Sequence, residues 1–291
     1  MPLLCLLLLP PVAGADNDDW SLGDDQAFPA TSPVVAGLLL GTDPQDSQTL
    51  SAWLLLPLTP DTELDLDYAR TRIDDGDDAF DSNDLGGRLS YWIGDRLGLY
   101  AGYRFQGQRD ALEIERLRIG ISRLSARGRI DLSLSQGDIA IYTRGDLPPP
   151  LHLPSRFTSD SNSIALELAH RFGAGEGMLS VERFDYDRDL SPLHARPLLQ
   201  RIISANALQQ SGLLLRQQWR IGWAWQGATR HYSLQWLDSQ NDIDGAHSRS
   251  LLFDLRQPID GPLDLLLGAG LDNDDGIRIS VSAGVEWTGT R

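Results

Sequence analysis

Gly276-Ile-Arg-Ile-Ser-Val-Ser-Ala-Gly-Val-Glu-Trp287, near the end of the chain, alternates apolar and polar side chains without interruption. The apolar set ends in an aromatic residue and consists of Ile277, Ile279, Val281, Ala283, Val285 and Trp287. A period of two predicts a β-strand with one apolar and one polar face. Because a tilted strand of about 9–11 residues crosses a bilayer, we expect this strand to span a membrane, with its polar face toward the interior of a barrel.

The same alternation recurs along most of the chain, in residues 62–72, 84–94, 96–107, 117–121, 130–134, 164–168, 213–225, 232–236, 251–255 and 265–269. Residues 34–42 and 50–56 are apolar on both faces, and the alternation in 180–186 loses phase near Glu182. In residues 129–142 the apolar parity changes at Gly137. Such a change of parity predicts a β-bulge at that glycine.

The connections between the predicted strands alternate between long acidic segments and tight turns. The long ones are residues 43–46, 73–84, 108–115, 144–161, 187–210, 240–247 and 271–276. The short ones are residues 58–61, 94–96, 124–128, 173–177, a turn near Gly222 or Gly227, and residues 258–262. This pattern predicts an all-β, transmembrane, antiparallel up-and-down β-barrel of about 14 strands, or of about 12 if residues 34–42 and their partner do not join the barrel.

Aromatic residues fall near the ends of the predicted strands, where two membrane interfaces are expected. The set comprises Tyr68, Trp92, Phe105, Tyr142, Phe172, Tyr186, Trp223, Trp225, Trp236 and Trp287. Aromatic girdles at both interfaces are typical of membrane barrels, and a soluble β-sandwich has no reason to carry them.

The first 15 residues carry no charged side chain and end in Ala13-Gly14-Ala15 after a leucine-rich run. They predict a secretory signal cleaved after Ala15, followed by a periplasmic segment at 16–32 and the barrel at 33–291. The single cysteine, Cys5, leaves with the signal, so the mature chain has no disulfide or thiolate chemistry. All 25 basic residues are arginine and the net charge is −16, which argues against nucleic acid as a partner.

Over nearly all of its mature length the chain resembles the outer-membrane β-barrel proteins of Gram-negative bacteria. The resemblance lies in the signal, the alternating strands, the long and short connections and the closing strand. It implies a monomer in the outer membrane that contacts lipid and lipopolysaccharide and is inserted by the barrel assembly machinery. Family members usually end on an aromatic residue, whereas here Trp287 is followed by residues 288–291.

Charged residues of the polar parity are predicted to face the lumen. They are Asp65, Asp67, Arg88, Arg104, Arg118, Asp131, Glu167, Arg171, Arg216, Asp254, Arg256, Arg278 and Glu286. Both signs occur in similar numbers, so two interpretations stay open: the lining of a water-filled pore, or a salt-bridge network that fills the interior. The connections 144–161 and 187–210 are read as a constriction of such a pore or as plain surface loops.

We therefore expect a porin-like channel for small solutes or an envelope transport component. A closed structural or adhesion barrel acting through acidic loops is the alternative. A third is an outer-membrane hydrolase, because His231-Tyr232-Ser233 copies the His-x-Ser spacing of outer-membrane phospholipase A. The Asp-rich tips at 74–78 and 272–275 are expected to bind divalent cations weakly at most. The histidines show no metal-ligand spacing, and no cofactor is expected.

Overall fold

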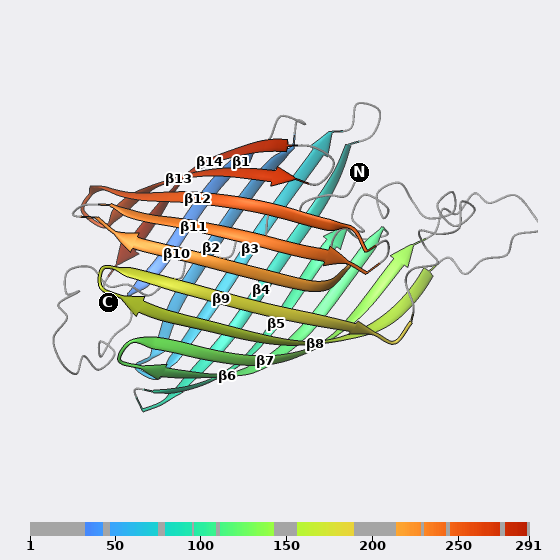
Figure 1. The fold of residues 1–291 in the computed structure, drawn as a ribbon, viewed down its shortest axis with the longest axis horizontal. Coiled ribbons are helices and arrows are strands. Elements are labelled where there is room, and N and C mark those ends of the chain that lie inside the picture. The colour runs from blue at the N-terminus through green and yellow to red at the C-terminus, as the bar shows by residue number, and fades with distance from the viewer. Residues whose placement is uncertain are drawn as a thin grey trace, which may run out of the picture.

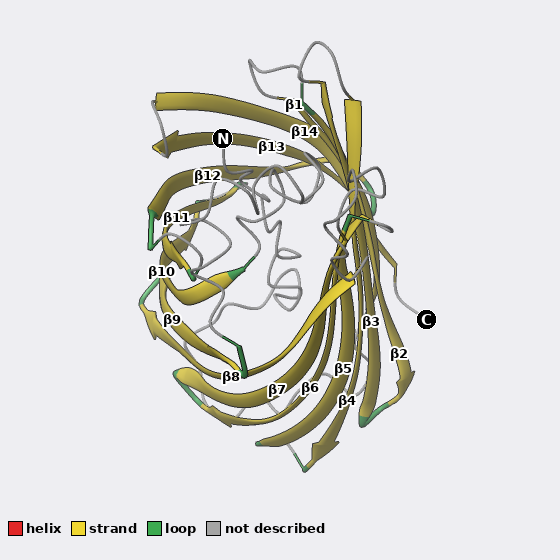
Figure 2. Ribbon diagram, turned by 90° about the vertical axis from the view of Figure 1, so that its right-hand side faces the viewer, coloured by secondary structure: helices red, strands yellow, loops and turns green. Residues whose placement is uncertain are grey.

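The structure is a computed structural model that describes residues 33–42, 47–74, 79–94, 96–108, 111–142, 156–188, 214–227, 230–242, 245–273 and 277–289. Fourteen antiparallel strands form one closed barrel (Figures 1 and 2). The strands are β1 (Val34–Thr42), β2 (Gln48–Thr59), β3 (Thr62–Asp74), β4 (Ala79–Ile93), β5 (Leu97–Gln108), β6 (Leu112–Ser125), β7 (Gly128–Tyr142), β8 (Arg156–Phe172), β9 (Gly175–Tyr186), β10 (Leu215–Gln226), β11 (His231–Asn241), β12 (His247–Asp260), β13 (Leu263–Asn273) and β14 (Ile277–Gly289). The predicted fold class is confirmed, with fourteen strands and not twelve.

The barrel is closed by the strand that carries the most regular alternation. β14 pairs with β13 on one side and with β1 on the other, and both ladders run without a register shift. Residues 34–42, whose membership was open from the sequence, form β1 and complete the ring with β2. Closure leaves no free strand edge, which is the condition for a sheet to sit in hydrocarbon.

The two ends of the barrel differ in how the strands are joined. At one end, the turn end, strands are joined by short turns, and Gly94, Gly173 and Gly261 adopt φ values of 60°, 62° and 55° there. Glycine takes such left-handed conformations without steric cost, which suits tight hairpins. The turn between β10 and β11 lies at Gly227, whose N–H donates to the carbonyl of Arg230 at 2.8 Å, whereas Gly222 lies inside β10. The opposite end is the loop end.

Several predicted segments lie outside the described residues. They are the signal at 1–15, the periplasmic segment at 16–32, and most of the connections predicted at 144–161 and 187–210. The Asp-rich tips lie mainly outside as well, because residues 75–78 and 274–276 are not described. Among the residues that are described, no helix is long and apolar enough to cross a membrane.

An apolar belt surrounds the outer face of the barrel. Alternate residues of the strands present exposed aliphatic and aromatic side chains there, including Leu89, Leu117, Ile119, Ile130, Leu132, Leu134, Ile164, Ile221, Phe253, Ile279 and Val281. An apolar surface that encircles a protein is far larger than the patches that soluble monomers expose. The belt is therefore the lipid-facing surface of a transmembrane barrel.

Strands on the loop end reach further than the alternation predicted. β4 begins at Ala79, β6 at Leu112 and β8 at Arg156, inside segments that the sequence assigned to connections. Beyond the belt the outward positions are polar, as at Glu115 and Asp160, so the apolar-polar contrast that marks a membrane strand disappears. The predicted long connections at 73–84, 108–115 and 144–161 are therefore wrong at these boundaries.

The predicted bulge at Gly137 is also wrong. β7 pairs with β6 and with β8 in continuous register through Gly137, and the backbone keeps its alternation. Register shifts occur instead between Pro57 and Thr59, between Pro258 and Asp260, and between Leu215 and Gln217. Proline lacks the N–H that a ladder needs, which explains the first two.

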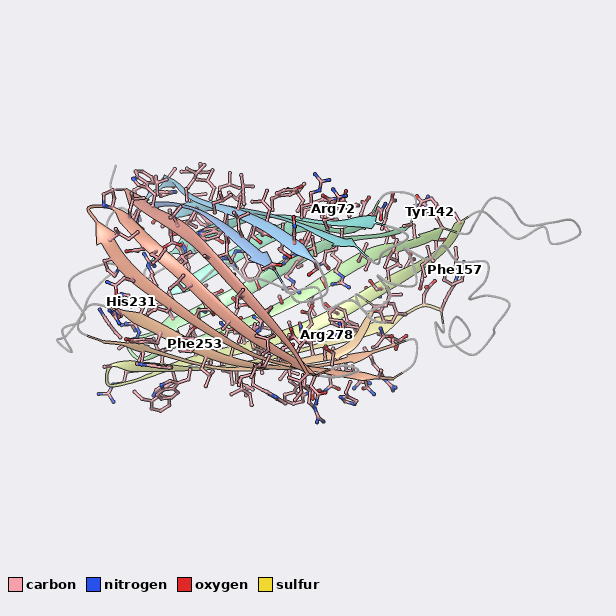
Figure 3. All side chains as sticks on the ribbon, turned by 90° about the horizontal axis from the view of Figure 1, so that it is seen from above. Arg72, Tyr142, Phe157, His231, Phe253 and Arg278 are labelled. Carbon is pink, nitrogen blue, oxygen red and sulfur yellow. The ribbon has the colours of Figure 1, made fainter. Side chains whose placement is uncertain are left out.

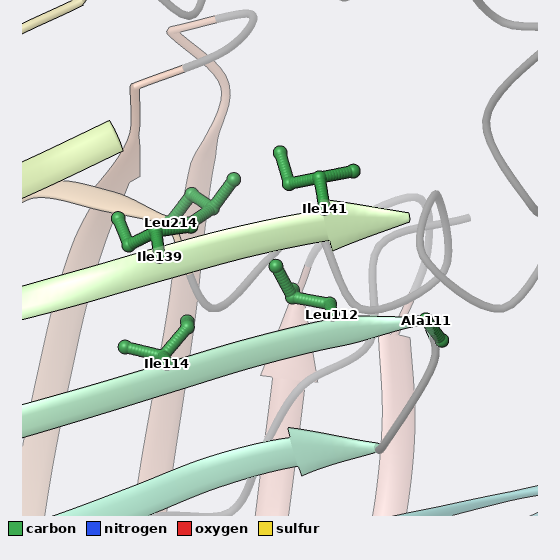
Figure 4. Packing of buried hydrophobic residues seen from close by; sticks show 6 residues of the cluster. All are labelled: Ala111, Leu112, Ile114, Ile139, Ile141 and Leu214. Carbon is green, nitrogen blue, oxygen red and sulfur yellow. The ribbon is translucent and has the colours of Figure 1, made fainter. Parts of the chain in front are cut away.

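What changes at Gly137 is the side of the sheet on which apolar residues are needed. Ile139 and Ile141 face the interior at the loop end and are almost fully buried. They belong to a cluster, hereafter the rim cluster, of Ala111, Leu112, Ile114, Ile139, Ile141 and Leu214 (Figure 4). Phe157 and Tyr186 pack against it. The loss of phase near Glu182 has the same cause, because Phe184 is also buried on the inner face.

Candidate functional site: the interior wall

The interior face of the barrel is identified by contacts that skip strands. Arg118 on β6 meets Glu182 on β9, with Nη2 and Oε1 2.5 Å apart, although β7 and β8 lie between them. Trp53 on β2 donates from Nε1 to Glu286 on β14 at 3.0 Å, across β1. Only on the concave side of a curved sheet do side chains two or three strands apart converge.

Glycines let these long side chains lie flat against the wall. A Cβ on Gly120 would lie 2.2 Å from the ring of Tyr100, which crosses β6 to reach Asp131 on β7. A Cβ on Gly37 would lie 1.9 Å from Trp53. These distances are far below van der Waals contact, so a larger residue in either place would lift the aromatic ring off the wall.

One charged network covers β3 to β5. Arg104 donates to Asp84 from Nε at 2.7 Å and from Nη2 at 2.9 Å, and it also reaches Asp67 at 3.3 Å across Gly86 on β4. Arg88 pairs with Asp65 at 3.1 Å on the same face. The predicted lumen residues of these strands are thus brought together, and Asp84, which was not among the predicted residues, accepts from Arg104 and from Gln106.

A second network braces the junction between β14 and β1. Glu286 is 1% exposed, accepts from Trp53 and lies 2.9 Å from Nη2 of Arg256 on β12. Arg256 also pairs with Asp264 on β13 at 2.5 Å. A buried carboxylate needs such partners, because a buried charge without one is costly. Glu286 therefore ties together both sides of the junction that closes the barrel.

A third region, on β6 to β9, has arginine side chains laid over small residues. Arg118 reaches Glu182 over Ser135 and Ser163, whose hydroxyls are hydrogen-bonded to each other. Ser163 also donates to Glu182 at 2.7 Å. Nearby on the turn-end side, Arg129 pairs with Glu167, and Asp131 accepts from Ser122 as well as from Tyr100.

The remaining predicted lumen residues fall in different places. Arg171 pairs with Glu176 at 3.4 Å, and Ser233 donates to Asp254 at 3.0 Å. Arg278 lies opposite Asp272 in the ladder with β13. Arg216 is different: it lies at the register shift of β10, is exposed, and joins none of these networks. Parity alone would have added Arg116, Arg129, Glu182, Arg220 and Asp264, which the sequence analysis left out.

The predicted interface aromatics divide into those on the outer belt and three exceptions. On the outer face lie Tyr68, Phe105, Phe172, Trp223, Trp225, Trp236 and Trp287, with Phe172 stacked on Trp223 at 5.7 Å between ring centroids. Trp92 lies between the outward Tyr91 and Ile93, so it faces inward over Gly98. The assignment of Trp92 to an interface was wrong, because a single residue of phase turns a side chain to the other face.

Tyr142 and Tyr186 are the other two corrections. Tyr142 is on the outer face but far beyond the belt at the loop end, where its hydroxyl donates to Glu113 at 3.0 Å (Figure 3). Tyr186 is on the inner face, packs against the rim cluster and donates to the carbonyl of Leu215 at 2.6 Å. Neither belongs to a membrane-interface girdle.

His231 and Ser233, which carry the His-x-Ser spacing, each lie beside a charged residue of β12. His231 lies at the turn end, opposite Arg256 in the ladder, and the hydroxyl of Ser233 is donated to Asp254 (Figure 3). Among the described residues no group of three or more His, Cys, Asp and Glu side chains is arranged to hold a metal ion.

No protein-family model and no curated protein matches the chain. Solved structures similar to it include a CymD monoaromatic hydrocarbon channel, with 8% identity, a TM-score of 0.49 and coverage of 89% of this chain and 88% of that chain. A bacterial polysaccharide outer membrane secretin has 10% identity and a TM-score of 0.48, and the match covers 89% of this chain and 99% of that chain. The outer membrane protein OprD from Pseudomonas aeruginosa has 9% identity and a TM-score of 0.44, and the match covers 88% of this chain and 92% of that chain. These are bacterial outer-membrane barrels, and with TM-scores below 0.5 they carry no argument about solute or mechanism.

Proposed function

We propose that the chain is a monomeric channel of the Gram-negative outer membrane that lets small polar solutes pass. The observation that carries the proposal is the form of the interior wall. Its charged and aromatic side chains lie along the wall over glycines and serines, and the contacts described above join strands at most three places apart around the ring. Among the described residues, side chains held in this way stay along the wall, and a barrel of about 14 strands has room for water at its axis.

The same proposal covers location and partners. Delivery requires the secretory signal expected at 1–15, and insertion requires the barrel assembly machinery. The apolar belt then contacts lipid, with lipopolysaccharide on the loop-end side. The hydroxyl of Ser233 is engaged by Asp254, which favours a channel over a barrel hydrolase.

Single-channel recording in planar bilayers tests the channel directly. We expect stepwise currents from the folded protein. The mature chain has no native thiol, so a cysteine placed at Ser282, on the inner parity of β14, should let a charged methanethiosulfonate reagent reduce those steps. The matched variant Val281→Cys, whose side chain is on the outer belt, should not respond. Folded barrels that stay silent would favour the filled, structural barrel instead.

A further inference from the structure

The guanidinium of Arg116, on the described part of the interior wall, has two buried donors without a partner. Its Nε and Nη2 are buried and have no hydrogen-bond partner. Its Cζ lies 4.7 Å from the centre of the Phe184 ring, a cation–π contact that engages the flat face of the group and not its edges. Nε and Nη2 lie on one edge of the plane, the edge that a carboxylate meets in a side-on bidentate pair.

The nearby carboxylates are already engaged by other groups. Glu182 is held by Arg118 at 2.5 Å and by Ser163 at 2.7 Å. Asp84, on β4, is held by Arg104 on β5, and Arg104 pairs with Arg116 in the β5–β6 ladder. Arg116 therefore has cationic neighbours and no carboxylate of its own among the described residues, and a desolvated cation in that setting favours an anion.

Arg116 lies on the part of the wall nearest the loop end. The residue as a whole is part-exposed on the inner face of β6, although its Nε and Nη2 are covered, and Leu117 marks the loop-end limit of the outer belt. Its stem crosses Gly137 on β7, where a Cβ would come within 2.8 Å of Cγ. Ile114, two residues toward the loop end, is fully buried in the rim cluster. Arg116 thus lies where the apolar rim gives way to the charged wall.

We propose that Arg116 is a binding site for the carboxylate group of small organic solutes entering from the loop end, with Phe184 fixing the plane of its guanidinium. The inference rests on the proposed channel function and names its substrate class. Once the groups that cover the Nε–Nη2 edge move aside, this edge donates to two coplanar oxygens, so the site discriminates carboxylates from neutral amides of the same shape. Such a site provides a local cation for anions in a chain whose net charge is −16.

The test uses the intact folded protein with propionate as probe and propionamide as its neutral isostere. In planar bilayers propionate should reduce the potassium chloride current of the wild-type channel, and propionamide should not. Arg116→Gln should weaken this effect of propionate about 10-fold or more, the loss expected for a charge-assisted hydrogen bond. Arg116→Lys, which keeps the charge without the fork, should be intermediate and guards against a Gln variant that fails to fold.

The matched control is Arg70→Gln, because Arg70 is also paired, with Asp81 at 2.7 Å, and half exposed, but it has the outward parity of β3 and lies outside the interior wall. It should leave the response to propionate within about twofold of wild type. Equal responses in wild type and Arg116→Gln, or equal effects of propionate and propionamide, would overturn the site. If no variant conducts, the channel proposal fails. Equilibrium dialysis of labelled propionate against the folded barrel in detergent then decides the site by itself: retention by wild type and not by Arg116→Gln supports it, and no retention overturns it.

Discussion

Two parts of one strand, β7, carry their apolar side chains on opposite faces of the sheet. From Ile130 to Leu134 the apolar side chains point outward, and Ser133 and Ser135 are buried on the inside. From Asp138 to Ile141 the polar side chain points outward, and the isoleucines are buried on the inside. The ladder with β6 and β8 is continuous across both parts.

The comparison shows that the chemistry on each face follows the medium that the face meets. Within the belt the outside is lipid and the inside is polar, so hydrophobic burial acts outward. Beyond the belt the outside is water, and apolar residues gain by burial only inside the rim cluster. The backbone has no part in the inversion.

The largest effect is expected from a charged residue placed on the lipid face of β7 within the belt. Leu132→Arg should lower the free energy of unfolding by about 2–4 kcal/mol, because Leu132 lies between Ile130 and Leu134 on the lipid face. Asp138→Arg, on the same strand and face but beyond the belt, should change it little. Heat-modifiable gel mobility and urea midpoints in lipid vesicles measure both. Equal damage from the two variants would mean that the belt does not end between these residues.

A smaller effect is expected from emptying the inside of the rim. Ile139→Ala should cost about 2 kcal/mol, the low end for truncating a buried aliphatic residue, because the rim cluster is small and lies at strand ends. Ile164→Ala makes the same deletion on the outer belt of β8, where lipid refills the space, so its cost should be lower. Urea unfolding in vesicles compares the pair. A greater loss from Ile164→Ala would contradict the assignment of Ile139 to a packed interior.

The smallest effect is expected from a polar contact beyond the belt, at the loop end of β8. The Ser159 hydroxyl, 2.6 Å away, holds the pKa of the Asp187 carboxyl below its usual range, and the N–H of Asp160 adds to this at 2.8 Å. A group with a lowered folded pKa stabilises above its unfolded pKa, and that contribution is lost as the pH falls through the folded value. Protection of the Asp160 amide should thus decrease below about pH 4.

Hydrogen exchange, corrected for the intrinsic pH dependence of the rate, reads this amide directly. Asp187→Asn should remove most of the pH dependence of its protection, while amides in the belt stay unchanged. A pH profile that is the same in wild type and in Asp187→Asn would show that Asp187 is not the group responsible.

The sequence was most informative where two media differ across the sheet. The alternation in residues 62–72, 117–121 and 276–287 predicted the strands and their outer face, and the short connections predicted most of the turns. The alternation did not predict the loop-end parts of β4, β6 and β8, because beyond the belt the outward residues are polar and the apolar-polar contrast between the two faces is lost. Trp92 and Tyr186 were misplaced because an aromatic near a strand end was taken for an interface residue without regard to its parity.

The interior wall was predictable only as a set of residues. Parity placed Asp65, Asp67, Arg88, Arg104 and Arg118 on one face, but not which of them meet. Arg118 and Glu182 are 64 positions apart in sequence, and two strands lie between them on the wall. Their contact depends on the curvature of the closed sheet and on the serines between them, and neither is encoded in a local pattern.

By itself the sequence determined that this chain forms a membrane barrel. Lipid on one side of a strand requires apolar and polar residues to alternate, and this alternation is visible in the sequence. The tertiary structure alone decided how many strands close the ring and where the apolar parity inverts. It also decided that Arg116 lies against Phe184 with one edge of its guanidinium unpaired. Those features depend on contacts between strands that are distant in sequence, and closure of the barrel is what brings such strands together.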